Sequence, residues 1–197
     1  MELNLNYIVG QTPLDEDEKD GLIPPIDSRV MLNELEQDNI NRAIVWARNI
    51  SPSLKDILSE NFLQRVHARM FGNIWNWAGT YRKTNKNIGV DKYEISSALK
   101  NVFDDCLFWI ENNTFNADEI AVRFKHRIVL VHPFANGNGR HSRLMGDILI
   151  QKHFKGQNFS WGNMSFVEEG EARKAYLAAI RKADQGDYKH LILFARS

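Results

Sequence analysis

The stretch His132-Pro-Phe-Ala-Asn-Gly-Asn-Gly-Arg-His-Ser-Arg143 places a histidine, two Asn-Gly pairs and two arginines within twelve residues. An apolar helix is expected to end at His132, because Pro133 cannot continue it. Asn-Gly pairs favour tight turns, so the chain is expected to turn at Asn136-Gly137 and to begin a new helix there. The stretch therefore predicts two helices joined by a short turn, and the other elements are assigned outward from it.

The start of the second helix is suited to binding an anion. Backbone N–H groups in the first turn of a helix have no partners within the helix, and the helix dipole is positive there. Glycines at 137 and 139 let an anion approach this backbone closely. Arg140 and Arg143 are three residues apart, hence on one face, and arginine binds phosphate through paired N–H groups. Two cations at a helix start oppose the dipole, and a bound phosphate would explain them.

His132 lies just across this turn, where it could act as a general base on a nucleophile that attacks the bound phosphate. Taken singly, each feature has a simpler explanation. The histidine could be a hydrogen-bonded structural residue, the Asn-Gly pairs an ordinary turn, and the arginines solvated surface. Their combination within one short stretch favours a phosphate-transfer site.

Composition limits the class of protein. With 197 residues, 43% hydrophobic and 25% charged, the chain is long enough for one globular domain with its own core. The 25 basic and 25 acidic residues balance, so no direct binding to nucleic acid is expected. Cys106 is the only cysteine, which excludes an internal disulfide and predicts a buried apolar position. Without a signal peptide or an apolar run of about 20 residues, we expect no membrane span and a cytoplasmic protein.

Helical periodicity dominates the remaining sequence. Ile120, Phe124, Ile128 and Val131 recur at spacings of four, four and three, which predicts one buried stripe on a helix over 118–131. Ser59 is a candidate N-cap for a helix that ends near Gly72. Similar patterns predict helices over 31–48, 95–111, 166–183 and 188–195. The leader over residues 1–29 is polar, and its acidic run LDEDEKD is expected to be a solvated short helix or loop.

One segment has a different character. Residues 74–90, IWNWAGTYRKTNKNIGV, are rich in Trp, Thr and Tyr, become polar, and return to Ile88 and Val90. This pattern favours an exposed hairpin over a helix. The predicted fold class is therefore mainly α, with one small β-hairpin.

The central stretch resembles the Fic-domain signature H-x-F-x-[D/E]-G-N-G-R-x-x-R. Its matching positions are His132, Phe134, Gly137, Asn138, Gly139, Arg140 and Arg143. The resemblance covers about residues 55–195 and includes IWNWAGTYR, EIAVRFKHRIVLVHPF and AYLAAIRKADQGDY. Through NLNYIVGQTPL and LNELEQDNI the whole chain is also similar to the Fic group called mobile mystery protein B. It implies a Fic-like helical domain over 55–197, preceded by an N-terminal extension over 1–54.

The resemblance implies transfer of AMP from ATP to a Ser, Thr or Tyr hydroxyl of a target protein, with Mg²⁺. His132 would deprotonate the hydroxyl, Arg140 would hold the phosphates, and Arg143 would hold the terminal phosphate. The anion nest would be formed by Gly137, Asn138 and Gly139.

Two further sets of residues follow from the resemblance. The hairpin tip would be a flap that pairs with the backbone of the target and aims its hydroxyl, and it consists of Lys86, Asn87, Ile88, Gly89 and Val90. Tyr176 and Asp184 fall where the family lines the adenine pocket. A helix-packing tyrosine and a residue of a C-terminal turn are the alternatives for these two.

Asn136 departs from the family pattern, which has a metal-binding carboxylate at this position. An amide oxygen can ligate Mg²⁺ but adds no negative charge, so a weaker metal site is expected. Three functions remain open. The first is AMP transfer with weak metal binding. The second is phosphorylation from a reversed nucleotide, as in Doc-type toxins of toxin–antitoxin pairs. The third is a nucleotide-binding or partner-binding module with little catalysis.

Many Fic proteins are inhibited by a glutamate in the pattern [S/T]-x-x-x-E-[G/N], which pairs with the second arginine of the signature. The letters match at residues 165–170, where Glu169 would be the inhibitor. Glu36 in LNELEQDN, on the predicted N-terminal helix, is the alternative. An antitoxin-like partner could supply the glutamate instead, and both residues could also be solvated surface glutamates.

Overall fold

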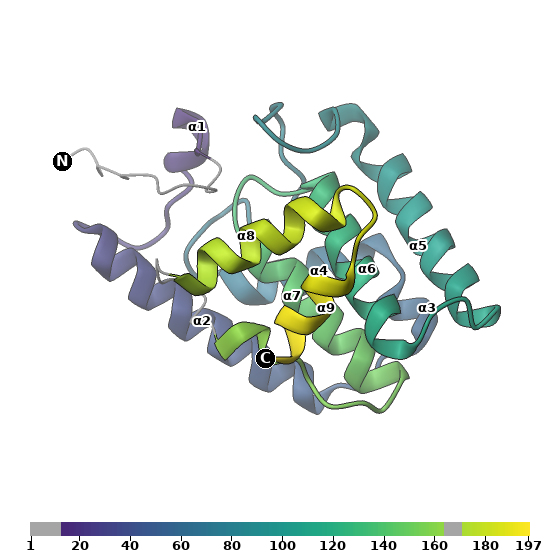
Figure 1. Ribbon diagram of the computed structural model, residues 1–197. Helices are drawn as coiled ribbons and strands as arrows, with labels where there is room; N and C mark the ends of the chain where they lie inside the picture. The colour runs from purple at the N-terminus through teal and green to yellow at the C-terminus, as the bar shows by residue number, and fades with distance from the viewer. Residues whose placement is uncertain (1–12, 164–170) are drawn as a thin grey trace.

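The computed structural model describes residues 13–163 and 171–197, and these residues are mainly helical (Figure 1). The mainly α fold class and the predicted helices are confirmed, apart from residues 166–170, which lie outside the described ranges. The α helices are α1 (Glu16–Lys19), α2 (Arg29–Asn49), α3 (Leu54–Ile57), α4 (Glu60–Phe71), α5 (Ile95–Glu111), α6 (Ala117–Val131), α7 (Asn138–Ile148), α8 (Glu171–Ala183) and α9 (Lys189–Arg196).

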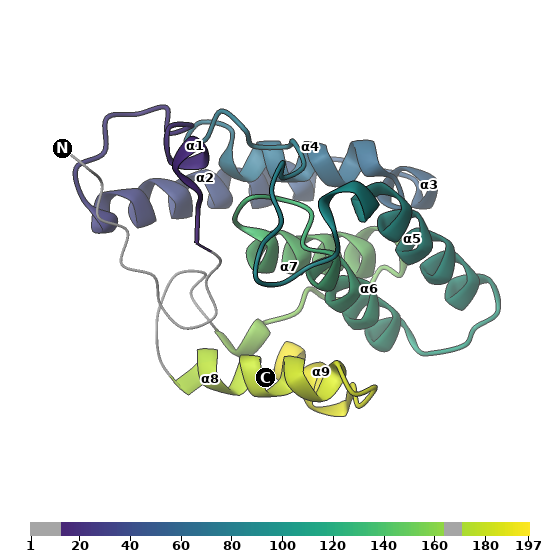
Figure 2. The same cartoon turned by 90° about the horizontal axis from the view of Figure 1, so that it is seen from above.

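The helices form layers around α6 and α7 (Figure 2). Helices α2 and α4 pack against each other on one side, and α4 also contacts α7. Helices α8 and α9 pack together on the opposite side, and α9 contacts α6. Helix α5 packs along α6. The turn between α6 and α7 is thus enclosed between an N-terminal layer and a C-terminal layer.

Local sequence signals explain where the central helices begin and which faces they bury. Ser59 accepts the N–H of Phe62 at 3.2 Å and caps α4, as predicted. The predicted stripe on α6 faces the core, and its residues Ile120, Phe124, Ile128 and Val131 are at most 5% exposed. Burying one such side chain contributes roughly 1.5–3 kcal/mol.

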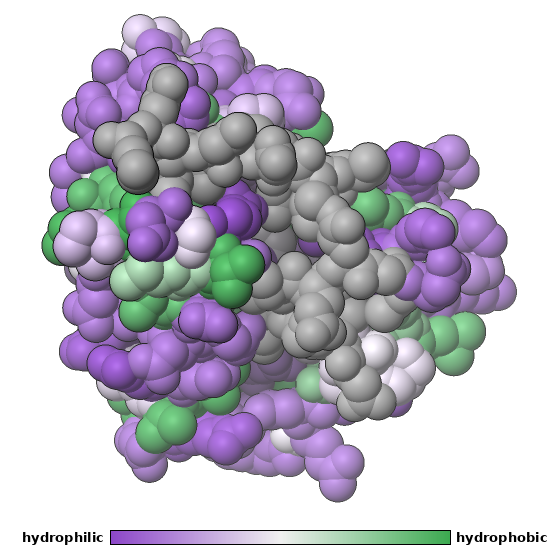
Figure 3. All heavy atoms as spheres, turned by 90° about the vertical axis from the view of Figure 1, so that its left-hand side faces the viewer, coloured by the Kyte–Doolittle hydropathy of each residue, from purple (hydrophilic) through white to green (hydrophobic). Residues whose placement is uncertain are grey.

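Cys106 lies buried on α5, as expected, and burial raises the pKa of its thiol to about 12. The face formed by α1 and the start of α2 is mostly hydrophilic, with hydrophobic side chains in separate patches (Figure 3). Within the described ranges, no helix is both long and apolar enough to cross a membrane.

The predicted β-hairpin over 74–90 is not formed. The described residues there run through turns and bends, and their one bridge pairs Trp75 with Leu22 of the leader. We call residues 83–90 the flap loop. Its polar residues lack the alternation that a half-buried strand needs.

A guanidinium replaces the cross-strand hydrogen bonds of the expected hairpin. Arg82 donates through Nη1 to the carbonyl of Thr84 at 2.8 Å and through Nη2 to the carbonyl of Val90. Its Nε donates to the carbonyl of His132 at 2.8 Å. The flap loop therefore closes around Arg82, and the same side chain ties it to the end of α6.

Candidate active site

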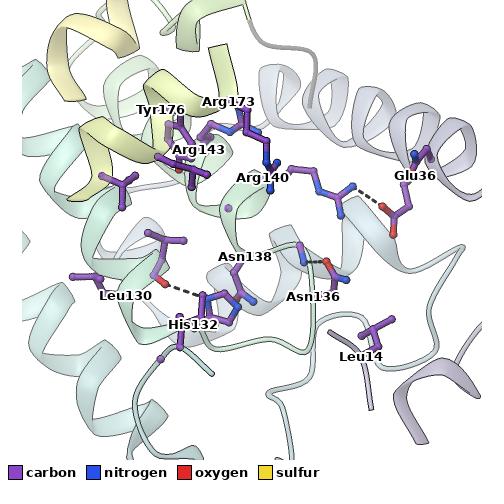
Figure 4. A pocket seen from close by; sticks show the side chains of 18 of the residues that line it. Leu14, Glu36, Leu130, His132, Asn136, Asn138, Arg140, Arg143, Arg173 and Tyr176 are labelled. Carbon is purple, nitrogen blue, oxygen red and sulfur yellow. Dashed lines mark hydrogen bonds and ion pairs between the residues drawn. The ribbon is translucent and has the colours of Figure 1, made fainter. Parts of the chain in front are cut away.

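One cavity of about 290 Å³ brings most of the predicted site residues together (Figure 4). Those that line it are Glu36, Ile88, Gly89, His132, Asn136, Gly137, Asn138, Gly139, Arg140, Arg143, Tyr176 and Asp184. Of the predicted flap residues, Lys86, Asn87 and Val90 are not among its lining residues. Glu169 lies outside the described residues.

His132 reaches the cavity because the chain reverses at this residue. It has the left-handed values φ 55° and ψ 57° directly after α6. Its Nδ1 lies 3.3 Å from the carbonyl of Val129, so we assign the proton to Nδ1 and the lone pair to Nε2. Burial lowers the pKa of His132 to about 4, against the hydrogen bond to Val129 and with help from the charge of Arg82. At neutral pH the imidazole is therefore uncharged and able to accept a proton.

The turn after His132 is stabilised by the side chain of Asn138 and requires glycine at position 137. Asn138 Oδ1 accepts the N–H of Phe134 at 2.9 Å, and Nδ2 donates to the carbonyl of Phe134 at 2.8 Å. Gly137 has φ 78°, and a Cβ there would lie 2.6 Å from the ring of Phe71. A Cβ at Gly139 would meet no atom within 4 Å. The side chain of Asn138 is thus structural, while the backbone at Gly139 has open space beside it.

Asn136 is engaged with the turn itself. Its Oδ1 accepts the N–H of Gly137 at 2.5 Å, and its carbonyl accepts from His67 Nε2 at 3.0 Å. Among the described residues there is no group of three His, Cys, Asp or Glu that could hold a metal ion. The described side chains therefore do not build a metal site of their own around Asn136.

The first arginine of the turn is paired with a glutamate. Arg140 Nη1 lies 2.5 Å from Glu36 Oε2, and Glu36 Oε1 accepts the indole N–H of Trp75 at 2.8 Å. Glu36 is only 5% exposed on α2. Figure 4 shows Glu36 and Arg140 pointing toward each other across the cavity. The pattern for an inhibitory glutamate predicted pairing with Arg143, and in this structure Glu36 pairs with Arg140 instead.

The second arginine lies near an aromatic side chain of α8 and a basic side chain of α6. The guanidinium of Arg143 is 5.6 Å from the ring centre of Tyr176, and Arg143 is 4% exposed. The Tyr176 hydroxyl accepts a hydrogen bond from Lys125, which is completely buried. Burial acts to raise the pKa of Tyr176, but the charges of Lys125 and Arg143 outweigh it and lower that pKa.

Asp184 also lines the cavity. Its Oδ1 lies 2.9 Å from His126 Nε2, while Leu177 and Ile180 of α8 supply apolar lining. Tyr176 and Asp184 thus line one cavity with the turn, as the adenine-pocket prediction requires. Sequence reasoning missed Lys125, although a lysine four residues after the buried Ala121 stands out on an apolar helix face.

Arg82 and Gly89 hold the flap loop against His132. Arg82 is 4% exposed and binds the carbonyl of His132. Gly89 has φ 102°, and a Cβ there would lie 2.7 Å from the Cβ of His132. Sequence reasoning did not select Arg82, and its place at the end of IWNWAGTYR was the available signal. The flap loop therefore borders the histidine directly.

The leader also contacts the flap loop, which the sequence did not indicate. The acidic run forms the short helix α1, but Asp15 and Glu18 bind Lys86 at 2.8 and 2.6 Å. Leu14 lines the cavity (Figure 4). The run is thus bound to the flap loop at two of its carboxylates.

Most of the residues that line this cavity lie within a segment that matches a known family. Residues 57–150 match the model of the Fic/DOC family. This segment is a Fic/DOC domain. The resemblance seen in the central stretch is confirmed, whereas the narrower likeness to mobile mystery protein B stays a prediction.

Curated relatives of the chain include proteins named protein adenylyltransferase. The chain is 27% identical over 147 residues to the protein adenylyltransferase fic-1 of Caenorhabditis elegans. It is 24% identical over 165 residues to the protein adenylyltransferase Fic of Drosophila grimshawi. These matches cover 71% and 82% of this chain but only 27% and 31% of the relatives. The chain thus spans less than a third of their length.

Solved structures agree on the fold. BepC of Bartonella tribocorum, with bound AMPPNP, superposes with a TM-score of 0.68 at 17% identity, covering 92% of this chain and 97% of BepC. The Fic domain of a putative cell filamentation protein from Bartonella quintana, with bound ADP, gives 0.65 at 16% identity. That match covers 87% of this chain and 86% of the other. The fold around the cavity is that of a Fic domain.

Proposed function

We propose that this protein transfers AMP from ATP to a hydroxyl side chain of a target protein. The observation that carries the proposal is one cavity in which His132, held neutral, faces a glycine-rich helix start with Arg140 and Arg143. The similar proteins named protein adenylyltransferase support this reaction, and the nucleotides bound to BepC and its Bartonella quintana counterpart support ATP as the substrate.

The proposed reaction assigns one task to each part of the cavity. Backbone N–H groups at the start of α7 and the two arginines hold the triphosphate. His132 Nε2 takes the proton of the target Ser, Thr or Tyr hydroxyl. The hydroxyl oxygen bonds to the α-phosphorus, the bond from that phosphorus to the bridging oxygen breaks, and pyrophosphate leaves. AMP stays on the target, and the proton stays on His132.

The adenine end and the flap complete the proposal. Tyr176 and Asp184 would border the base, with apolar support from Leu177 and Ile180 of α8. Residues 86–90 of the flap loop would align the backbone of the target, because Ile88 and Gly89 line the cavity beside His132.

Glu36 is proposed to act as an internal inhibitor. Its carboxylate occupies Arg140, so the phosphates of ATP must displace it before this arginine can bind them. Glu169 stays a second prediction, and so does inhibition by an antitoxin-like partner.

Mg²⁺ is proposed to arrive with ATP. Asn136 would offer one amide oxygen, and phosphates and water would supply the other ligands. The metal would neutralise phosphate charge, and no residue role above depends on it.

Labelled ATP tests the proposed function. The protein is incubated with a cell lysate and with ATP that carries the label either on the α-phosphate or on the γ-phosphate. Transfer of the α-label alone, with a mass gain of about 329 Da on the modified protein, identifies AMP transfer. Transfer of the γ-label alone, with a gain of about 80 Da, would identify the Doc-like reaction instead.

Matched histidine variants connect the label to the cavity. His132→Ala should lower the transfer by roughly 10²–10⁴-fold, whereas His190→Ala, which changes an exposed histidine of α9, should leave it intact. If the wild-type protein transfers neither label, the proposed function is wrong and a binding module is the better explanation.

A further inference from the structure

Lys86 of the flap loop is covered by carboxylates from the leader. Its Nζ lies 2.8 Å from Asp15 Oδ2 and 2.6 Å from Glu18 Oε2, and its side chain is only 3% exposed. The hydroxyl of Thr84 donates to the same Asp15 Oδ2 at 2.5 Å. Lys86 and Thr84 thus form a two-donor receptor that holds one carboxylate oxygen.

The leader follows the neighbouring loop over several residues. The N–H of Asn76 donates to the carbonyl of Gly21, and the N–H of Ile23 donates to the carbonyl of Ile74, each at 2.8 Å. The indole N–H of Trp77 donates to the carbonyl of Glu18 at 2.8 Å. We call residues 14–23 the acidic strap. Together these contacts align the acidic strap with residues 74–77, which precede the flap loop and its two-donor receptor in the chain.

The acidic strap also reaches the cavity. Leu14 is 5% exposed and lines the cavity together with Ile88, Gly89 and His132. A target hydroxyl that approaches His132 across the flap loop therefore arrives where the acidic strap already lies. The strap occupies the path that the proposed function gives to the target.

The strap brings more negative charge to the receptor than the receptor neutralises. Two carboxylates face one ammonium group, and Glu18 Oε2 accepts hydrogen bonds from both Lys86 Nζ and the N–H of Asp15. The other oxygen, Glu18 Oε1, is buried and has no hydrogen-bond partner among the described residues. A buried acceptor without a partner opposes the contact that buries it. The receptor therefore accepts a carboxylate, while this particular occupant fits it imperfectly.

We propose that Lys86, with Thr84, receives an acidic side chain of the target protein, and that Asp15 and Glu18 occupy this receptor until the target arrives. The proposal rests on the proposed function, because the target is the substrate of AMP transfer. It names the substrate class as a segment with Asp or Glu close to the modified hydroxyl. Charge complementarity at the receptor carries the inference, together with its position in the flap loop, whose Ile88 and Gly89 line the cavity with His132.

Peptide binding to the full chain tests this. The probe is a fluorescent peptide with the sequence of residues 13–20, Pro-Leu-Asp-Glu-Asp-Glu-Lys-Asp, and its partner probe has Asn and Gln in place of Asp and Glu. Fluorescence anisotropy is measured without ATP on proteins that all carry His132→Ala. The variant Asp15→Asn/Glu18→Gln vacates the receptor. Asp17→Asn is its control, because within the described ranges Lys86 forms ion pairs with Asp15 and Glu18 only.

We expect the vacated variant to bind the acidic peptide about tenfold more tightly than the protein with the unmodified strap does, and about tenfold more tightly than Asp17→Asn does. The vacated variant should also bind the acidic peptide at least tenfold more tightly than it binds the neutral peptide. Adding Lys86→Gln should remove this gain, whereas Lys83→Gln, at an exposed lysine of the flap loop, should preserve it. Equal binding of both peptides, or a gain that survives Lys86→Gln, would overturn the proposal. If Lys86→Gln fails to fold in a thermal melt, Lys86→Arg replaces it and should retain the gain.

The outcome is separable from that of the proposed function. Acidic-peptide binding without any transfer of the α-label would overturn AMP transfer and leave the receptor standing. Transfer of the α-label with equal rates for acidic and neutral targets would overturn the receptor alone.

Discussion

The two layers that enclose the turn surround its two arginines with side chains of different charge. The N-terminal layer supplies a carboxylate, because Glu36 of α2 binds Arg140 at 2.5 Å. The C-terminal layer supplies an aromatic ring and a further cation, Tyr176 and Arg173 of α8, and Arg143 lies over the ring. The Tyr176 hydroxyl also binds Lys125 of the central helix α6. Burial lowers the pKa of Arg143, and the charges of Arg140 and Arg173 lower it further against the opposing effect of Tyr176.

The phosphates of ATP should therefore have a different effect beside each layer. Beside Glu36 the phosphate replaces a carboxylate that the chain already provides. Beside Tyr176 the phosphate adds negative charge to a cluster in which cations repel one another. ATP should therefore gain most of its binding energy on the C-terminal side, while the N-terminal side controls access.

The largest expected effect lies at the residue between the two layers. His132→Ala should lower the rate of AMP transfer by roughly 10²–10⁴-fold, because proton transfer by a positioned base contributes that much. Adding Glu36→Gln should not restore the rate, since freeing Arg140 does not supply a base. Single-turnover rates of the single and double variants measure this, and a restored rate would show that His132 serves binding alone.

Removing the carboxylate of the N-terminal layer should sharpen the contrast. Glu36→Gln should raise ATP affinity about tenfold, because the phosphates then meet Arg140 without a competitor. The same change should lower the Tm by several degrees, since it leaves a largely buried guanidinium without its charged partner. Titration calorimetry measures the ATP affinity, and scanning calorimetry measures the Tm. Glu34→Gln, at an exposed position of α2, is the control for both measurements. An unchanged affinity would show that Glu36 is not an inhibitor.

Adding a carboxylate to the turn should change ATP affinity in a direction that depends on the Mg²⁺ concentration. Asn136→Asp should weaken ATP binding about threefold without Mg²⁺, because like charges repel, and should strengthen it about threefold with limiting Mg²⁺. Titrations of ATP at several Mg²⁺ concentrations measure both. An effect of the same sign at every concentration would place Asn136 away from any metal.

The smallest effect should come from pH and from the histidines between the layers. Burial lowers the pKa of His132 and His141 to about 4, so the folded protein takes up their protons only near that pH. The unfolded chain takes them up near pH 6.5, so stability is lost as the pH falls from 6.5 toward 4. The Tm should drop by several degrees between pH 7 and 5, while the transfer rate should stay level. A rate that falls with a midpoint near pH 6.5 would contradict the low pKa of His132.

The sequence predicted those parts of the site that depend on neighbours in the chain. The α6 stripe, the Ser59 cap and the turn after His132 arise from periodicity, a side-chain cap and two glycines. These signals act over a few residues, so they can be read without knowing how the helices pack.

Contacts between distant residues escaped prediction for the same reason. Glu36 and Arg140 are 104 positions apart, and which arginine the glutamate meets depends on how α2 packs against α4 and α4 against α7. A carboxylate between Leu32 and Ile40 on a buried helix face was the available hint. The hairpin prediction failed because Arg82 takes hydrogen bonds that composition alone assigned to paired strands.

Calorimetric titration with ATP tests the central claim, that the turn between His132 and Arg143 holds the phosphates. Arg143→Ala should weaken binding roughly tenfold to a hundredfold, the loss expected for a charge-assisted hydrogen bond. In the wild-type background, Arg140→Ala should lower ATP affinity less than Arg143→Ala does. In the Glu36→Gln background, the two arginine variants should lower ATP affinity equally. Arg181→Ala, at an exposed position of α8, should leave ATP affinity unchanged. Unchanged ATP affinity in both Arg140→Ala and Arg143→Ala would contradict the claim.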